Sequence, residues 1–96
     1  MQMSFPDPNF DVWSFKRALG KEVFGENMMP LNINRSRYGL YTIIVYTRNC
    51  YRDVGRVHDY LKSQGFGLMT IEDNRLICFE KDIQNLVTLY KMKGVL

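Results

Sequence analysis

One cysteine and one histidine in the middle of the chain are the residue types that could form a nucleophilic pair. Cys50 lies near a predicted helix start between two cations, Arg48 and Arg52, which is a setting typical of reactive thiols. His58 follows on the same predicted helix, eight residues later, which places the two residues about 12 Å apart. A general base has to lie within about 3 Å of the group that it activates. We therefore expect no Cys–His catalysis and interpret His58 as a residue at the edge of the core.

Other chemical signatures are missing from the sequence as well. One histidine and two cysteines, Cys50 and Cys78, stand at separate places and do not make a zinc-binding set. Without a secretory signal, the two cysteines are expected to be free, buried thiols. The carboxylates occupy turn and capping positions, and neither Gly-x-x-x-x-Gly-Lys nor Gly-x-Gly-x-x-Gly occurs. We expect no enzymatic activity, no bound metal and no cofactor.

The middle of the chain is basic. The net charge is only +3, but the segment from Arg35 to Arg56 carries five arginines against one carboxylate, Asp53. Arg52 and Arg56 are four residues apart on the predicted solvent face of a helix, where like charges repel by about 0.2–0.5 kcal/mol. An anionic partner would relieve this repulsion, because guanidinium groups match phosphate and carboxylate oxygens. The arginines form either a solvated face without a partner or an anion- and nucleic-acid-binding patch. The residues of this patch are Arg35, Arg37, Arg48, Arg52 and Arg56.

A second candidate surface lies on the first predicted helix. Its apolar stripe is formed by Val12, Phe15, Leu19 and Val23. Helical phase places an aromatic and basic group on the other side, where Trp13 and Arg17 are spaced to stack on each other. Either the N-terminal arm folds over this side of the helix, or a partner contacts it. The candidate partner-binding residues are Phe10, Trp13, Lys16, Arg17 and Phe24.

Three helices are predicted from apolar periodicity and capping residues. The first runs from a cap at Asp11 to about Phe24, where Gly25 ends it. The second begins at Asn49 or Cys50 and ends at Gly65. The third is capped by Asp82 and ends at Gly94, and its inner face is expected to be formed by Ile83, Leu86, Val87 and Tyr90.

The strands follow from β-branched and aromatic runs. Residues 38–47 are apolar on both faces, which is typical of a central strand. Residues 68–72 and 75–79 predict a hairpin around Asp73-Asn74, with Glu72 opposite Arg75. The sequence leaves open whether a further strand forms near residue 32. The residues expected to be nearly inaccessible are Ile43, Val45, Leu61, Ile77, Phe79 and Leu86.

These elements define an α+β fold in a single domain, 1–96. Residues 1–10 form an extended arm, because two prolines there disfavour helix, and residues 11–96 form the globular body. The sheet is a single layer of three strands, or four, with antiparallel or mixed pairing and three helices. The expected order is α-β-α-β-β-α, which has part of a ferredoxin-like connectivity.

One stretch resembles a nucleic-acid-binding motif. Residues 65–71 are similar to the RNP1 strand of RNA-recognition motifs, and residues 41–46 are similar to its RNP2 partner. However, Gln64 stands in place of the leading basic residue, and Leu68 and Ile71 occupy positions that are aromatic in the family. Only one helix fits between the two strands, whereas the family has a helix and a strand there. We therefore assign the chain to no family on this resemblance.

The sequence favours a non-enzymatic protein-binding module that docks through its aromatic and basic helix face. A short chain without an active-site signature and with such a helix face is typical of small accessory, inhibitor or assembly proteins such as phages encode. The alternative is a nucleic-acid-binding protein that uses the arginine-rich middle of the chain. A second copy of the chain is also an open choice of partner. No apolar run reaches the length of a membrane span, so we expect no membrane association and a cytoplasmic location.

Overall fold

Four strands form one antiparallel sheet in which β2 and β4 are central. The computed structural model describes residues 11–25 and 31–96, apart from the side chain of Arg37. The strands are β1 (Leu31–Arg35), β2 (Leu40–Val45), β3 (Thr70–Glu72) and β4 (Arg75–Phe79). Their order in the sheet is β1-β2-β4-β3. The α+β class is confirmed, and β1 is the strand that the sequence left open. The predicted arm, with Phe10, lies outside the described residues.

Part of the connectivity is that of a split β-α-β unit. β2 and β3 each pair antiparallel with β4, so they run parallel to each other with β4 between them. The chain passes from β2 to β3 through helix α2 (Cys50–Ser63). This arrangement confirms the expected partial ferredoxin-like connectivity. β1 completes the sheet on the other side of β2.

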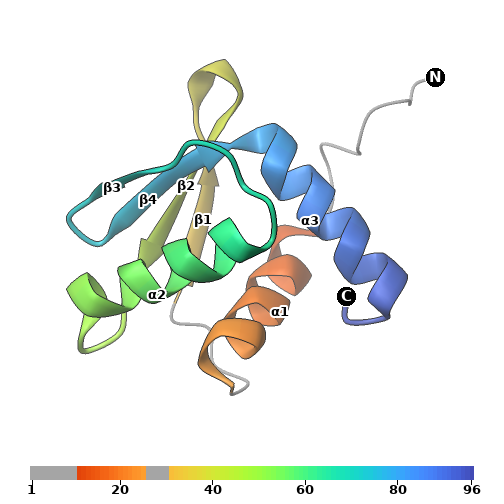
Figure 1. Cartoon of the computed structure of the whole chain (residues 1–96), viewed down its shortest axis with the longest axis horizontal. Coiled ribbons are helices and arrows are strands. Elements are labelled where there is room, and N and C mark those ends of the chain that lie inside the picture. The colour runs from red at the N-terminus through yellow and green to blue at the C-terminus, as the bar shows by residue number, and fades with distance from the viewer. Residues whose placement is uncertain (1–10, 26–30) are drawn as a thin grey trace.

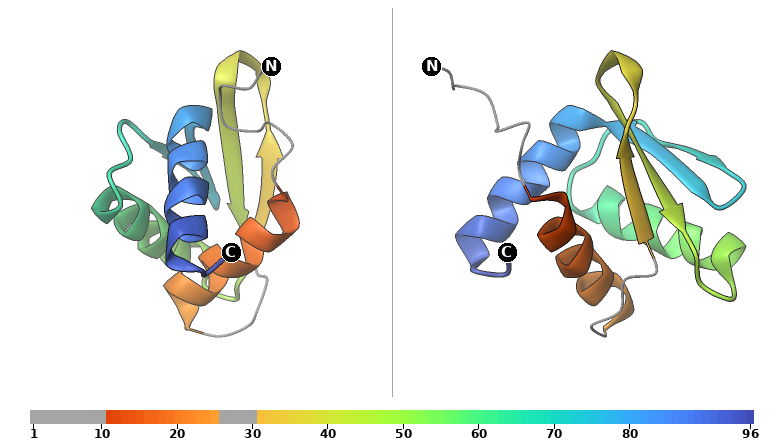
Figure 2. Two further views of the ribbon diagram at one scale, coloured as in Figure 1. Left: turned by 90° about the vertical axis from the view of Figure 1, so that its right-hand side faces the viewer. Right: turned by 180° about the vertical axis from the view of Figure 1, so that it is seen from behind.

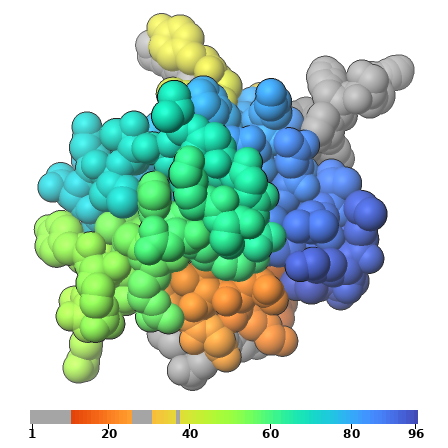
Figure 3. Space-filling view, in the orientation of Figure 1, coloured from red at the N-terminus to blue at the C-terminus, as the bar shows by residue number. Residues whose placement is uncertain are grey.

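All three helices pack on the same face of the sheet. Helices α2 and α3 (Glu80–Lys93) lie on the viewer's side of the strands in Figure 1, α1 (Val12–Phe24) lies next to β1, and the views in Figure 2 show no helix on the opposite face. In Figure 3 the helices cover much of the inner face of the sheet, whereas the β3–β4 hairpin and the segment before it remain visible at one edge. The strand side chains buried beneath them are Leu31, Ile33, Tyr41, Ile43, Val45, Leu76 and Cys78.

Helix ends follow the capping residues in two of the three helices. The Asp11 side chain caps α1, and Gly25 ends it in the left-handed conformation, as Gly94 ends α3. The predicted cap at Asp82 is wrong, because α3 begins at Glu80 and Phe79 occupies the cap position without a side-chain hydrogen bond. The Asp82 carboxylate instead accepts a hydrogen bond of 3.0 Å from the Gly67 N–H. It therefore ties the segment before β3 to the first turn of α3.

Core predictions hold on the helices and on β2 but fail on β4. Ile43, Val45, Leu61 and Leu86 are buried as predicted. In contrast, Ile77 is only half-buried and Phe79 is 44% exposed. The hairpin places Glu72 opposite Arg75, as predicted, and this register turns residues 75, 77 and 79 away from the helices. Leu76 and Cys78 therefore fill the core positions that were assigned to Ile77 and Phe79.

Aromatic side chains link the three helices beneath the sheet. The rings of Phe15 on α1 and Tyr90 on α3 lie 5.8 Å apart, and the Tyr90 hydroxyl hydrogen-bonds to the Tyr60 hydroxyl of α2. Burial raises the pKa of both phenols, so both stay neutral. This contact holds one residue from each helix in a single cluster.

The face assignment of β4 can be tested by truncating two adjacent residues. Leu76→Ala should lower the free energy of unfolding by about 2–5 kcal/mol, because it opens a cavity in the core. Ile77→Ala should cost about 1 kcal/mol, because its side chain lies on the uncovered face. Urea denaturation of both variants measures the difference. Equal losses, or a larger loss for Ile77→Ala, would contradict the register.

Candidate functional site

The first turn of α1 presents Trp13 to solvent. The Asp11 carboxylate accepts hydrogen bonds from the backbone N–H groups of Trp13 and Ser14, at 3.0 and 3.3 Å, and from the Ser14 hydroxyl at 2.7 Å. These hydrogen bonds lower the pKa of Asp11, and the bond from the Ser14 hydroxyl has the largest effect. The Asp11 carboxylate therefore stays ionised and keeps the helix start in place. Trp13 is 48% exposed, whereas Phe15, two residues later, is fully buried. The helix start therefore holds a large aromatic side chain outside the core.

Two cations flank the Trp13 ring. The Lys16 Nζ atom lies 5.9 Å from the ring centroid, and the Arg17 Cζ atom lies 6.0 Å from it. Each contact is worth about 0.5–1 kcal/mol at an exposed site. We call Trp13, Lys16 and Arg17 the Trp13 surface. It combines an apolar ring with two hydrogen-bonding cations, which are side chains typical of interface centres.

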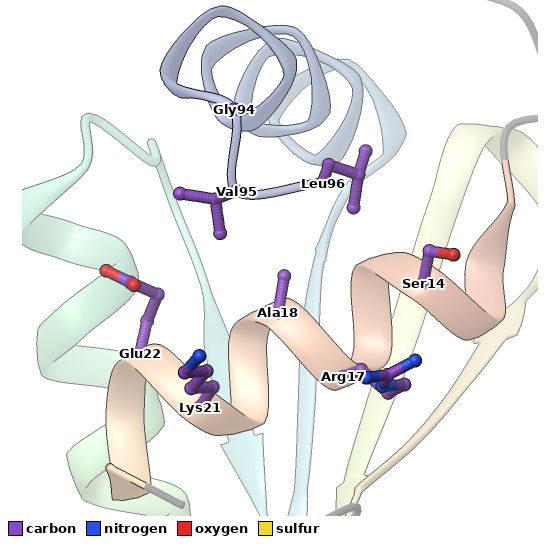
Figure 4. A pocket seen from close by; sticks show the side chains of 8 residues that line it. All are labelled: Ser14, Arg17, Ala18, Lys21, Glu22, Gly94, Val95 and Leu96. Atoms are coloured by element: carbon purple, nitrogen blue, oxygen red, sulfur yellow. The ribbon is translucent and has the colours of Figure 1, made fainter. Parts of the chain in front are cut away.

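A hollow of about 440 Å³ adjoins this surface, between α1 and the end of α3. Arg17 belongs to both features. In Figure 4 the Ala18 side chain points from α1 towards Val95 and Leu96 across the hollow. The hollow thus has an apolar floor and a charged rim, which suits an apolar side chain beside a carboxylate. Its lining residues are Ser14, Arg17, Ala18, Lys21, Glu22, Gly94, Val95 and Leu96.

Phe24 is not brought together with Trp13. The two residues stand at opposite ends of α1, about 16 Å apart along the helix axis. Phe24 packs against the core, and the Arg56 guanidinium lies 5.1 Å above its ring. Arg56 also donates a hydrogen bond of 3.2 Å to the Val23 carbonyl oxygen. Phe24 therefore serves the contact between α1 and α2.

The five arginines do not form one patch. Arg35 stands opposite Tyr41, at the start of β2, whereas Arg48 and Arg52 follow the end of that strand. The two groups lie at opposite ends of β2 in Figure 1, separated by more than about 13 Å along the strand. Arg37 belongs to the turn beside Arg35, and its side chain lies outside the described part of the structure.

Carboxylates of the chain itself already pair with three of these arginines. Arg35 forms an ion pair of 2.9 Å with Glu80. Arg52 and Arg56 both contact the Asp53 Oδ1 atom, at 3.3 and 3.5 Å. The repulsion expected between Arg52 and Arg56 is thus relieved within the chain. Arg48 forms no ion pair within residues 11–25 and 31–96.

Asp53 holds the connection between β2 and α2 in place. Its side chain is almost fully buried, and its Oδ2 atom accepts a hydrogen bond of 2.6 Å from the Thr47 hydroxyl. This hydrogen bond, and next the contacts with Arg52 and Arg56, lower the pKa of Asp53 against the opposing effect of burial. The sequence assigned Asp53 no such role, because Thr47 lies six residues away across a loop.

The cysteines and the histidine do not assemble into a site. Burial raises the pKa of Cys78 to about 12, so its thiol stays protonated. Cys50 is a free, half-buried thiol, and the His58 Nδ1 atom lies 3.2 Å from the adjacent Asp59 carboxylate. Among the described residues, no three His, Cys, Asp or Glu side chains are placed to bind one metal ion.

Comparison with known proteins yields no match to any protein family, curated protein or solved structure. The geometry of the chain is therefore the basis for interpreting the site. Within the described segments, no helix has the length and apolar character needed to cross a membrane. The sequence had singled out Trp13, Lys16 and Arg17, but it missed the hollow. Gly94 followed by two apolar residues was the available signal, since such tails often fold back on the preceding helix.

The role of Asp53 can be tested by its pH dependence. Asp53→Asn should lower the free energy of unfolding by about 1–3 kcal/mol at neutral pH, because it removes a buried, hydrogen-bonded charge. The carboxylate stabilises the fold above its unfolded pKa of about 3.9, and this contribution is lost as the pH falls through the lower folded-state pKa. Denaturation at several pH values should show that the difference in unfolding free energy between the wild type and Asp53→Asn disappears at a pH below both pKa values. A stability difference that does not change with pH would contradict this role.

Proposed function

We propose that the protein is a non-enzymatic binding module that docks on another protein through the Trp13 surface. The observation that supports this proposal best is an exposed tryptophan with two cations near its ring, beside a hollow large enough to take a partner's side chain. Tryptophan and arginine are the residues whose truncation most often costs an interface 2 kcal/mol or more. The module would act in the cytoplasm as a small accessory, inhibitor or assembly factor.

The charge of the surface indicates an acidic segment as the partner. Lys16, Arg17 and Lys21 stand on α1 against two carboxylates, those of Glu22 and of the capping residue Asp11, which leaves a net positive charge. A partner segment with an apolar side chain next to Asp or Glu would fill the hollow and pair with Arg17 and Lys21. The guanidinium of Arg17 can hold a carboxylate through two parallel hydrogen bonds.

The nucleic-acid alternative receives less support. The arginines that would carry it stand in two separate groups, and Arg35, Arg52 and Arg56 are already engaged by Glu80 and Asp53. A phosphate backbone would have to compete with these ion pairs. The alternative remains one outcome of the experiment below.

Photo-crosslinking in the source cell tests the proposal. A benzoylphenylalanine placed at position 13 should capture a partner that the same group at position 51 does not. Tyr51 is the matched control, because it is also an exposed aromatic residue on a helix. The captured protein, once purified, should bind Trp13→Ala and Arg17→Glu at least about tenfold more weakly than the wild type.

Stability measurements separate binding from folding. Trp13→Ala should lower the free energy of unfolding by no more than about 1–2 kcal/mol, because the half-exposed side chain gives up only its two cation contacts and part of its burial. A loss of about 3–5 kcal/mol would show instead that Trp13 is buried within the chain. Equal capture at positions 13 and 51 would also contradict the proposal. Binding of labelled DNA that weakens steeply with salt would favour the alternative. The expected slope of log Kd against log salt is about 0.7 per phosphate contact for single-stranded DNA and about 0.9 for duplex DNA.

A further inference from the structure

The face of the sheet that points away from the helices carries an apolar centre. Leu40 stands opposite Phe79 across β2 and β4, Ile77 stands opposite Thr42 in the next row, and Ile44 stands opposite Arg75 in the row after that. A sheet face left to solvent normally carries polar side chains. Here no described helix covers it (Figure 2), although both central strands place apolar residues there. We call this surface the outer sheet face.

The rim of the outer sheet face is polar and neutral. The edge strand β1 contributes Asn32 and Asn34, and β3 contributes Thr70 and Glu72. The charges that the four strands place on this face belong to Glu72 and Arg75, which stand directly opposite each other and cancel. A basic or acidic partner would find no net charge to match. The face is therefore of a different kind from the Trp13 surface.

We propose that the outer sheet face binds the same face of a second copy of this chain. A neutral surface with an apolar centre and its own pair of opposite charges is complementary to itself about a two-fold axis. Two such sheets stack about 10 Å apart with interdigitated side chains, which gives a four-layer dimer with helices outside and sheets inside. The helical sides of the two copies then point outward.

The size of the face sets the expected strength of the dimer. Four strands about 4.8 Å apart and about five residues long give a footprint on the order of 300 Å². This is small beside the roughly 800 Å² per partner that stable complexes bury. We therefore expect a weak, reversible dimer that forms between micromolar and near-millimolar protein concentration.

Sedimentation velocity from low micromolar to near-millimolar protein tests the dimer. The wild type should shift from monomer to dimer, and Phe79→Asn should raise the Kd at least about tenfold. Asparagine suits this position for folding, because residue 79 is the N-cap of α3. Ile71→Asn is the matched control: Ile71 is 43% exposed, close to Phe79, but it points to the other face of the sheet. This control should leave the Kd unchanged.

Charge reversal provides a second test. Arg75→Glu places two carboxylates side by side on each copy, so it should weaken the dimer. The double variant Glu72→Arg/Arg75→Glu restores the neutral pair and should restore the dimer. A wild type that stays monomeric at near-millimolar concentration would overturn the proposal, as would equal effects of Phe79→Asn and Ile71→Asn. A dimer that Trp13→Ala disrupts and Phe79→Asn does not would also overturn it, without affecting the Trp13 surface as a docking site.

Discussion

The pairing register of β2 with β4 is the constraint on which the rest of the structure depends. It places Tyr41 and Ile43 of β2 beside Cys78 and Leu76 of β4 on one face, and this face buries all four. Because side chains alternate along a strand, a shift of one residue would exchange the two faces of β4. The register also brings Arg75 opposite Glu72 of β3. The inner and outer faces are thus fixed together, and the helices can pack on only one of them.

Burial against that inner face then decides which parts of the helices stay free. Phe15 and Leu19 anchor α1 in the core, so the start of the helix has to present Trp13 outward. Gly94 reverses the chain after α3 and brings Val95 and Leu96 towards α1, which forms the hollow. The candidate docking site is therefore a consequence of how α1 and α3 are packed, and it needs no specialised loop.

Electrostatics divides the basic residues of the chain into two groups. The arginines around α2 and β1 are paired with Asp53 and Glu80, and Arg56 also holds the carbonyl end of α1 through Val23. The Arg35–Glu80 ion pair and the hydrogen bond from Arg56 to Val23 join elements that are distant in the chain. Lys16 and Arg17 of α1 contact the Trp13 ring instead, which leaves their hydrogen-bonding groups open to a partner. For this reason, the positions of the arginines in the sequence were a poor guide to the candidate docking site.

The sequence by itself determined the features that act within one or two turns of chain. The caps at Asp11, Gly25 and Gly94, the Asp73-Asn74 turn and the opposition of Glu72 and Arg75 were all predictable, because their signals are local. Tertiary structure alone decided which face of β4 is buried. Both faces of that strand carry apolar side chains, so the sequence pattern does not indicate which of them points to the core. It also decided that Asp82 accepts a hydrogen bond from Gly67, and that Asp53 contacts Thr47 and two arginines. A carboxylate binds the donors that packing brings near it, and these are not evident from the sequence. The hollow depended on packing for the same reason, as its two walls are more than seventy residues apart in the chain.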